Sequence, residues 1–311
     1  MKKNIYTIAF TLILSLSFTE AWAGNDNESD KAKSHTYYIN APRFVYPLIE
    51  KWIAEYKQIK PENDFAIAKS VASKAVSSIN IQISDTKVEN DNNKTVYIAK
   101  YAILPIIAKG SAAYQIIGKK EFNEKKLKNL FFIGNDVDEN ENKDKVTGHV
   151  VVYSGYGNTS VAIPFASYYG ENASNFRGKN IAGDDIFLNT AIEKDPYGIS
   201  FNAVPNIYDI QSRLIKNNLD IIHLDVSNEQ QNAFSSLDKL ITSLEISNIK
   251  GIPVEKVGFT YNKDNNMIDD FVSWILTIGK NYNHQYGLLE LNIKDVAQET
   301  TKVKSAIIAK K

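Results

Sequence analysis

The chain has 311 residues, 36 basic and 36 acidic side chains, and no cysteine. A formal charge of zero gives no sign of the basic surface that attracts nucleic acids, so no nucleic-acid partner is expected. The absence of cysteine excludes disulfides, thiolate metal sites, a cysteine nucleophile and an acylated N-terminal cysteine.

The N-terminus has the pattern of a cleavable signal peptide. Two lysines precede an apolar run from Ile5 to Phe18, and Ala21-Trp22-Ala23 follows as a small-x-small cleavage site. A membrane span needs about 20 apolar residues, so an N-terminal anchor is the weaker interpretation. We expect residues 1–23 to be removed on export, residues 24–34 to be a flexible lead-in, and the mature protein to be periplasmic.

Strands and helices are expected to alternate in the first part of the chain. The clearest helix carries an apolar stripe at helical spacing from Val45 to Tyr56 and stops before Pro61. The expected strands are His35 to Asn40, Phe65 to Ala68 and Ile79 to Ile83, with a short helix from Val71 to Ser77. This order favours a mostly parallel sheet with helices on both faces.

The remainder continues the alternation, beginning with a long apolar strand from Val96 to Ala108 that is expected to pass from one lobe into another. Further expected strands are His149 to Tyr153, Gly198 to Phe201, Asp220 to Leu224 and Val254 to Tyr261. Further expected helices are Glu121 to Leu130, Ser160 to Tyr169, Ile186 to Ile192, Glu229 to Leu244 and Met267 to Ile278. The order of the basic C-terminal tail is left open.

No catalytic constellation is evident in the sequence. The four histidines stand alone, without a second ligand at metal-binding spacing, and nucleotide-binding and serine-hydrolase motifs are absent. The adjacent pairs Asp184-Asp185 and Asp269-Asp270 are interpreted as surface charge, because neighbouring residues on a helix point in different directions. We therefore expect a protein that is not an enzyme and has no cofactor or metal.

Three segments share a different design, in which a strand runs into a turn of small or hydroxyl residues that opens a helix. They are Asn40 to Phe44, Lys69 to Ser73, and Ser154 to Ser160. Free backbone N–H groups and a partial positive charge make a helix start a prepared anion site. The alternative is that the serines and threonines only cap their own helices.

The order of these segments resembles the phosphate-binding proteins of bacterial ABC transporters. The similar stretches are APRFVYP at 41–47, the serines at 70–73, Ser84-Asp85, YSGYGNT at 153–159, GISF at 198–201, and the helix that starts at Phe271. The similarity spans nearly the whole mature chain, although no single motif is strong.

The resemblance implies an α/β protein with the two-lobed, type II periplasmic-binding-protein fold and a ligand cleft between the lobes. Lobe one would comprise 35–104 plus 246–311, and lobe two 105–245. Carried over position by position, the ligand contacts fall on Arg43, Phe44, Ser70, Ser73, Asp85, Gly157, Asn158 and Thr159. The alignment does not choose between Ser70 and Ser73.

The implied function is a periplasmic receptor, expected as a monomer, that delivers inorganic phosphate or a similar small anion to an ABC-transporter permease in the inner membrane. Asp85 would select a ligand that donates a proton, as hydrogen phosphate does and sulfate does not. Alternatives are a sensor or scavenger of another small anion and, more weakly, an exported phosphate-ester hydrolase.

Two positions depart from the family pattern. Arg43 stands where the family has threonine, and Tyr153 stands where it has arginine. We hypothesise that Arg43 replaces the missing guanidinium from across the cleft; the rival hypothesis is that the pocket has diverged to another ligand.

Overall fold

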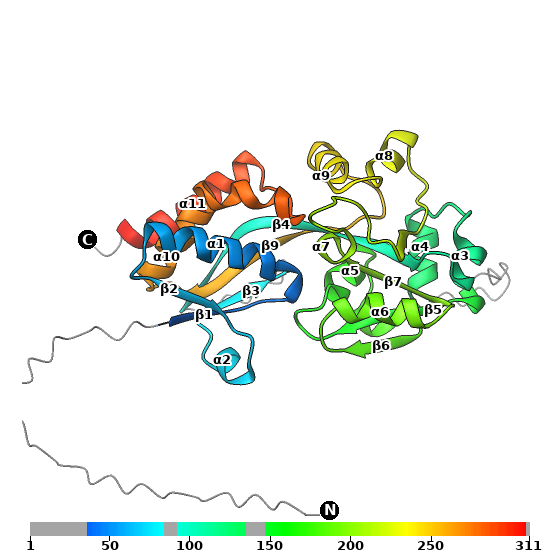
Figure 1. Ribbon diagram of the computed structural model, residues 1–311, viewed down its shortest axis with the longest axis horizontal. Helices are drawn as coiled ribbons and strands as arrows, with labels where there is room; N and C mark the ends of the chain where they lie inside the picture. The colour runs from blue at the N-terminus through cyan, green and yellow to red at the C-terminus, as the bar shows by residue number, and fades with distance from the viewer. Residues whose placement is uncertain (1–35, 84–91, 135–146, 309–311) are drawn as a thin grey trace, which may run out of the picture. The chain divides into compact units, whose positions relative to one another are not determined.

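The computed structural model describes residues 36–83, 92–134 and 147–308. The predicted signal peptide and lead-in, and the predicted site residue Asp85, lie outside the described residues. Within the described part of the chain, nine strands form one sheet in the order β2-β1-β3-β9-β4-β7-β5-β6, with β8 paired to β4 (Figure 1). The strands are β1 (Thr36–Asn40), β2 (Asp64–Ile67), β3 (Ile79–Gln82), β4 (Asn93–Ala108), β5 (Val151–Tyr156), β6 (Lys179–Ala182), β7 (Gly198–Ala203), β8 (Leu219–Ile221) and β9 (Val254–Asn262).

The sheet is mixed rather than mostly parallel. Parallel pairing joins β1 to β2 and β3, and β5 to β6 and β7. The central strands β4 and β9 pair antiparallel with each other and with their other neighbours. The prediction followed local strand–helix alternation, which does not reveal that β9 returns from late in the chain to the middle of the sheet.

One strand runs through both halves of the sheet. β4 pairs with β9 from Asn93 to Ala102, and then with β7 and β8 from Ile103 to Ala108. We call the half with β1, β2, β3 and β9 the first lobe, and the half with β5 to β8 the second lobe. This is the predicted two-lobed α/β arrangement. The residue boundaries of the lobes given above stay a prediction.

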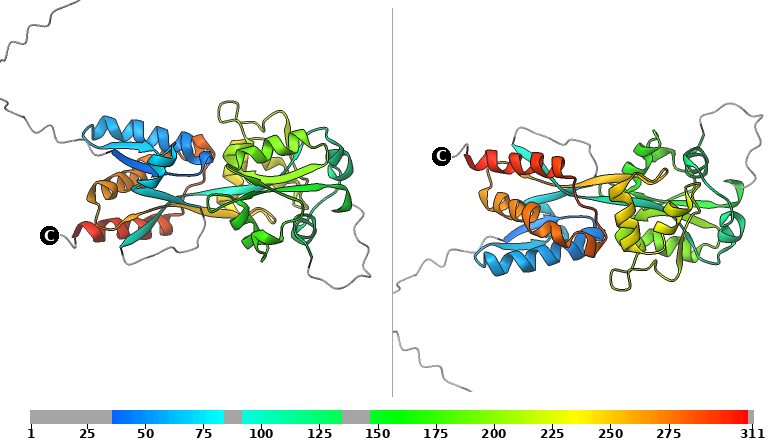
Figure 2. Two further views of the ribbon diagram at one scale, coloured as in Figure 1. Left: turned by 90° about the horizontal axis from the view of Figure 1, so that it is seen from below. Right: turned by 90° about the horizontal axis from the view of Figure 1, so that it is seen from above.

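The first lobe carries three long helices, α1 (Tyr46–Ile59), α10 (Asn266–Thr277) and α11 (Ile293–Ile308), which lie side by side over its strands (Figures 1 and 2). α1 forms as the apolar stripe predicted, and it buries Leu48, Ile49, Trp52 and Tyr56. The indole of Trp52 donates to the carbonyl of Gly279 at 2.7 Å, which ties α1 to η4 (Gly279–Tyr282) after α10. The short helix α2 (Val71–Ala75) follows β2.

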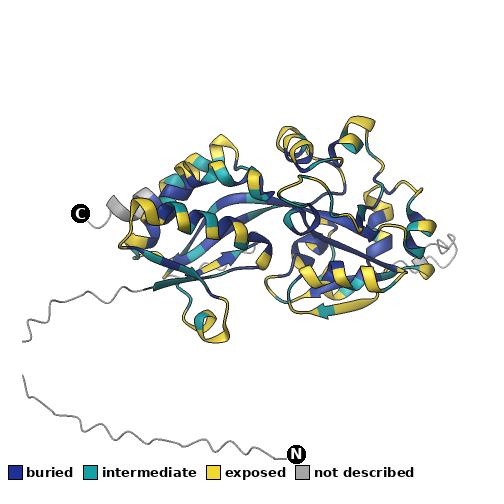
Figure 3. Ribbon diagram, viewed as in Figure 1, coloured by how far each residue is buried: buried dark blue, intermediate teal, exposed yellow. Residues whose placement is uncertain are grey.

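The second lobe is built from shorter helices around its strands, and the inner strands β4, β5 and β7 are mostly buried (Figure 3). These helices are α3 (Ala112–Ile117), α4 (Glu124–Phe131), α5 (Ala162–Tyr168), α6 (Ile186–Lys194), α7 (Val204–Ile207), α8 (Asn228–Ala233) and α9 (Leu237–Ile246). The single helix predicted from Glu229 to Leu244 is wrong. It is broken into α8 and α9 because Ser236 caps a new start by accepting the N–H of Lys239. None of the described helices is both long and apolar enough to cross a membrane.

Candidate functional site

The first predicted turn places Arg43 at the junction of the lobes. After β1, the extended residue Pro42 leads into the 3-10 helix η1 (Arg43–Val45). Phe44 is buried, and its ring packs on that of Tyr101 in β4 with centroids 4.9 Å apart. Phe44 therefore anchors the turn to the core, whereas the side chain of Arg43 is 60% exposed.

Arg43 reaches Asp184, which lies between β6 and α6 in the second lobe. The backbone N–H of Arg43 donates to Asp184 Oδ2 at 3.3 Å, and its Nε lies 3.9 Å from the same oxygen. The other oxygen of Asp184 accepts the N–H of Ile186 at 3.0 Å, in the first turn of α6. One carboxylate thus joins η1 of the first lobe to the start of α6.

The third predicted turn lies beside this contact, but its helix begins later than predicted. α5 starts at Ala162, so Gly157, Asn158 and Thr159 lie in a turn before it, where Asn158 and Thr159 are exposed. Gly157 has φ +110°, a left-handed conformation that favours glycine.

The start of α5 is already occupied by a carboxylate of the chain itself. Asp185 Oδ2 accepts the N–H of Val161 at 2.7 Å, and its Oδ1 accepts the hydroxyl of Ser160 at 2.8 Å. A Cβ at Gly155 would lie 2.1 Å from Asp185 Oδ1, so only glycine allows this close approach. Burial raises the pKa of Asp185 to about 6, although the bonds from Val161 and Ser160 lower it.

The interpretation of the two aspartate pairs as surface charge is wrong for Asp184, Asp185 and Asp269, whereas Asp270 is exposed as expected. Asp185 is buried at the start of α5, and Asp184 contacts the other lobe. Asp269 is fully buried as well, where it accepts the hydroxyl of Tyr261 and pairs with Lys94 at 2.6 Å. The side chains of adjacent residues point in different directions, but at the start of a helix both can find partners. Asp184 bonds toward the first lobe, and Asp185 bonds to the start of α5.

At the second predicted turn, the serines behave as the alternative interpretation describes. The Ser70 hydroxyl accepts the N–H of Ser73 at 3.1 Å, and the Ser73 hydroxyl accepts the N–H of Ser70 at 3.0 Å. In this capping box the two serines satisfy the backbone N–H groups at the start of α2, with Ser70 exposed and Ser73 half-buried. The neighbouring Lys69 pairs with Glu50 of α1 at 2.9 Å.

Tyr46 connects these groups electrostatically. Burial raises the pKa of its phenol; Arg43 and Lys69 act to lower it, and Asp184 and Glu50 act to raise it. Lys69, beside the second turn, thus acts on the same phenol as Arg43 and Asp184.

Tyr153 does not supply the charge that the family arginine would. It is buried, and its hydroxyl donates to Asp195 Oδ2 at 2.8 Å. The structure thus brings together Arg43, Asp184, Asp185 and Ser160, and it places Ser70 and Ser73 in a separate cap. Of these four, the prediction named only Arg43 as a site residue.

A sequence signal for the missed residues did exist. Gly183-Asp184-Asp185 follows the short strand β6 and opens α6, which is the same strand–turn–helix design as the three predicted segments. β6 spans only four residues and was not predicted. In the part of the chain that the structure describes, no group of three or more histidine, cysteine, aspartate or glutamate residues could hold a metal ion.

Comparison with known proteins gives similar structures but no match at the sequence level. Neither a scan of family models nor a search of curated proteins finds a match. A phosphate ABC transporter substrate-binding protein from Clostridium perfringens, solved with bound phosphate, is 18% identical, covers 83% of this chain and 100% of its own, and has a TM-score of 0.54.

Two further structures are similar at lower scores. A possible phosphate-binding protein from Planctomyces limnophilus is 8% identical, with 88% and 99% of the chains covered and a TM-score of 0.48. An ABC-type phosphate transport receptor from Vibrio cholerae is 12% identical, with 82% and 100% covered and a TM-score of 0.47. The first similarity confirms the predicted two-lobed fold.

Proposed function

We propose that the chain is an exported, non-catalytic receptor for a small oxyanion, with phosphate as the first candidate, that delivers its ligand to an ABC-transporter permease. The ligand binds where η1 of the first lobe meets the β5–α5 and β6–α6 turns of the second. The phosphate-bound protein of similar fold supports this choice of ligand. No reaction is part of the proposal, and Asp85 stays a predicted selector of protonated ligands.

One observation carries the proposal: the exposed guanidinium of Arg43 lies beside helix starts of the other lobe. A dehydrated anion needs directed N–H donors and compensating positive charge. Arg43 supplies the charge from the first lobe, and the exposed Asn158 and Thr159 lie in the turn before α5 of the second. An anion held between them would join the lobes.

A second candidate is a receptor or scavenger of a singly charged anion such as a small carboxylate. It is favoured by Tyr153, which is neutral and bonded to Asp195 where the family pattern has a guanidinium. With one cation fewer in the second lobe, a divalent anion is compensated less well than a monovalent one.

Titration calorimetry of the protein, refolded to remove bound solutes, tests the proposal. We expect saturable one-to-one binding of phosphate that weakens roughly 10- to 100-fold in Arg43→Ala, because a charge-assisted contact to the ligand is lost. Lys57→Ala is the matched control, since Lys57 is a similarly exposed cation of α1 at 58% and is paired with Asp64.

The outcomes separate the candidates. Binding of acetate or lactate in preference to phosphate would favour the second candidate. Phosphate affinity that is equal in wild type and Arg43→Ala would remove Arg43 from the site, and no binding of any small anion would end the receptor assignment.

A further inference from the structure

Asp184 and Asp185 accept backbone N–H groups at three helix starts from both lobes. Arg43 N belongs to η1, Val161 N lies at the start of α5, and Ile186 N lies in the first turn of α6. The pair also accepts the Ser160 hydroxyl and approaches the Arg43 guanidinium. Helix starts, a hydroxyl and a guanidinium are the donors that an oxyanion ligand requires.

The two carboxylates are held very differently. Asp185 is 6% exposed and makes two bonds of 2.7 and 2.8 Å within the second lobe. The contacts of Asp184 with the first lobe are long, at 3.3 and 3.9 Å, and lead to a guanidinium that is 60% exposed. Asp185 is therefore a fixed part of the second lobe, whereas the contact of Asp184 with Arg43 is exchangeable.

We propose that Asp184 is an internal competitor for the anion site and sets its affinity. In the absence of ligand, its carboxylate occupies the donors of Arg43; an incoming anion takes them over, while Asp184 keeps its bond to Ile186. The inference rests on the proposed function, because it assigns Asp184 a role at the same site.

Two physical effects follow from this arrangement. A tethered carboxylate has a high effective concentration at Arg43, so a free anion must outcompete it. Once displaced, the carboxylate still lies near the bound anion and repels it, which selects against ligands of higher charge. Both effects lower anion affinity, and both depend on the charge of Asp184.

Asp184→Asn tests the proposal, because the amide oxygen can still cap α6 while the charge is removed. Inorganic phosphate is titrated into wild type, Asp184→Asn, Arg43→Ala and the double variant. We expect Asp184→Asn to bind phosphate roughly tenfold more tightly than wild type, and the gain to shrink when Arg43 is also replaced, because the competition for Arg43 is then absent.

Asp209→Asn is the matched control. Asp209 is also a second-lobe aspartate at a turn, where it accepts the N–H groups of Gln211 and Ser212. Its replacement should leave phosphate affinity unchanged.

Each result decides between the two claims. Equal phosphate affinity of wild type and Asp184→Asn overturns the competitor role but leaves the receptor function standing. A gain of the same size without Arg43, or one that Asp209→Asn reproduces, also overturns it, since the effect would then be one of general charge. Absence of phosphate binding in every variant rejects both phosphate as the ligand and Asp184 as its competitor.

Discussion

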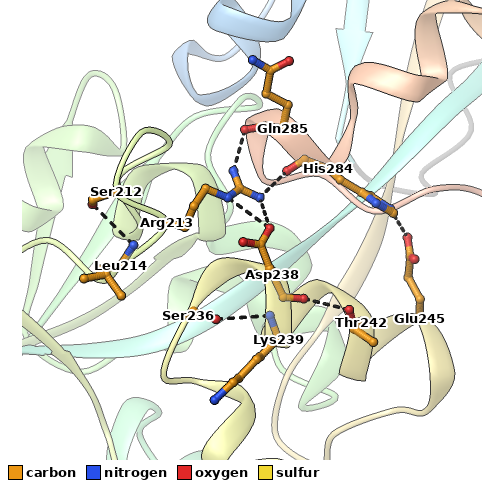
Figure 4. Close-up of polar contacts among 10 residues, drawn as sticks. All are labelled: Ser212, Arg213, Leu214, Ser236, Asp238, Lys239, Thr242, Glu245, His284 and Gln285. Atoms are coloured by element: carbon orange, nitrogen blue, oxygen red, sulfur yellow. Dashed lines mark hydrogen bonds and ion pairs between the residues drawn. The ribbon is translucent and has the colours of Figure 1, made fainter.

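Two arginine–aspartate contacts lie where the lobes meet, and they are built in opposite ways. Arg43 touches Asp184 through two long contacts, at 3.3 and 3.9 Å, and its guanidinium is largely exposed. Arg213 lies in the loop after α7, and its Nε and Nη2 both donate to Asp238 of α9, at 3.1 and 2.6 Å. The same guanidinium donates to the carbonyls of Gln285 and His284 at 2.7 and 2.9 Å (Figure 4).

The Arg213 contact is further supported along α9. Glu245, near the end of that helix, approaches His284 Nε2 at 2.9 Å (Figure 4). It also accepts the N–H of Glu290 at 2.7 Å. His284 belongs to η5 (His284–Tyr286), which continues from α10 and η4 of the first lobe. Several short bonds therefore fasten α9 to the first lobe, whereas two long contacts join Arg43 to the second.

The difference indicates a division of roles. A multidentate guanidinium with several acceptors is strong and geometrically fixed. An exposed single contact contributes little to stability and is easily replaced. The Arg213 contact is thus suited to hold the lobes together, and the Arg43 contact to exchange its partner for a ligand.

The largest expected loss of stability comes from removing the Arg213 contact. Arg213→Ala should lower the free energy of unfolding by about 3 kcal/mol, because three acceptors lose a charged donor. Arg43→Ala should lower it by less than about 1 kcal/mol. Urea unfolding of both variants measures the contrast, and equal losses would erase the distinction between the two contacts.

Replacing Arg213 by glycine separates the contribution of its side chain to stability from that of its backbone conformation. Arg213 has φ +62°, a left-handed conformation that is unusual outside glycine. Arg213→Gly should therefore be less destabilised than Arg213→Ala by about 1 kcal/mol. If the two variants unfold alike, backbone strain has no part in this contact.

The next effect distinguishes the fixed carboxylate from the exchangeable one. The pKa of Asp185 is raised to about 6 in the folded protein, mainly by burial, from an ordinary value near 3.8. The folded state therefore binds this proton more tightly than the unfolded state, and the associated stability is present below about pH 4 and lost as the pH rises through 6.

Comparison of wild type with Asp185→Asn isolates this titration. The stability of wild type relative to the variant should fall by an amount on the order of 2 kcal/mol between pH 4 and pH 7. If the stability difference between wild type and Asp185→Asn does not change with pH, the carboxyl group of Asp185 is not buried with a raised pKa.

The fold was largely predictable because its signals are local. The apolar stripe of α1 and the long apolar run of β4 identify both elements directly. The position of β9 between β3 and β4 was not predictable, because it depends on pairing between segments far apart in the sequence. The break between α8 and α9 was missed because apolar spacing continues across the cap at Ser236.

The site was predictable only at Arg43. The strand–turn–helix pattern identified that turn, but it cannot tell whether a helix start is open or already capped. The starts of α2 and α5 are both filled, one by its own serines and the other by Asp185 from a different turn. That second case is a tertiary contact over 24 residues, which no local pattern contains.

The smallest energetic effect concerns Asp184, yet it is the sharpest test of the comparison. Asp184→Asn should cost less than about 1 kcal/mol of stability, because the contact it removes is exposed and long.

The distance between the lobes should respond more to Asp184→Asn than the stability does, since the Asp184 contact holds the Arg43 side of the junction. The chain has no native cysteine, so spin labels at Lys57→Cys in α1 and Lys125→Cys in α4 report that distance without interference. In ligand-free protein, pulsed electron resonance should show a broader or longer distribution for Asp184→Asn than for wild type. If the distance distribution of Asp184→Asn equals that of wild type, the Arg43–Asp184 contact does not restrain the lobes. The bonds of Arg213 and Glu245 alone would then keep the lobes in place.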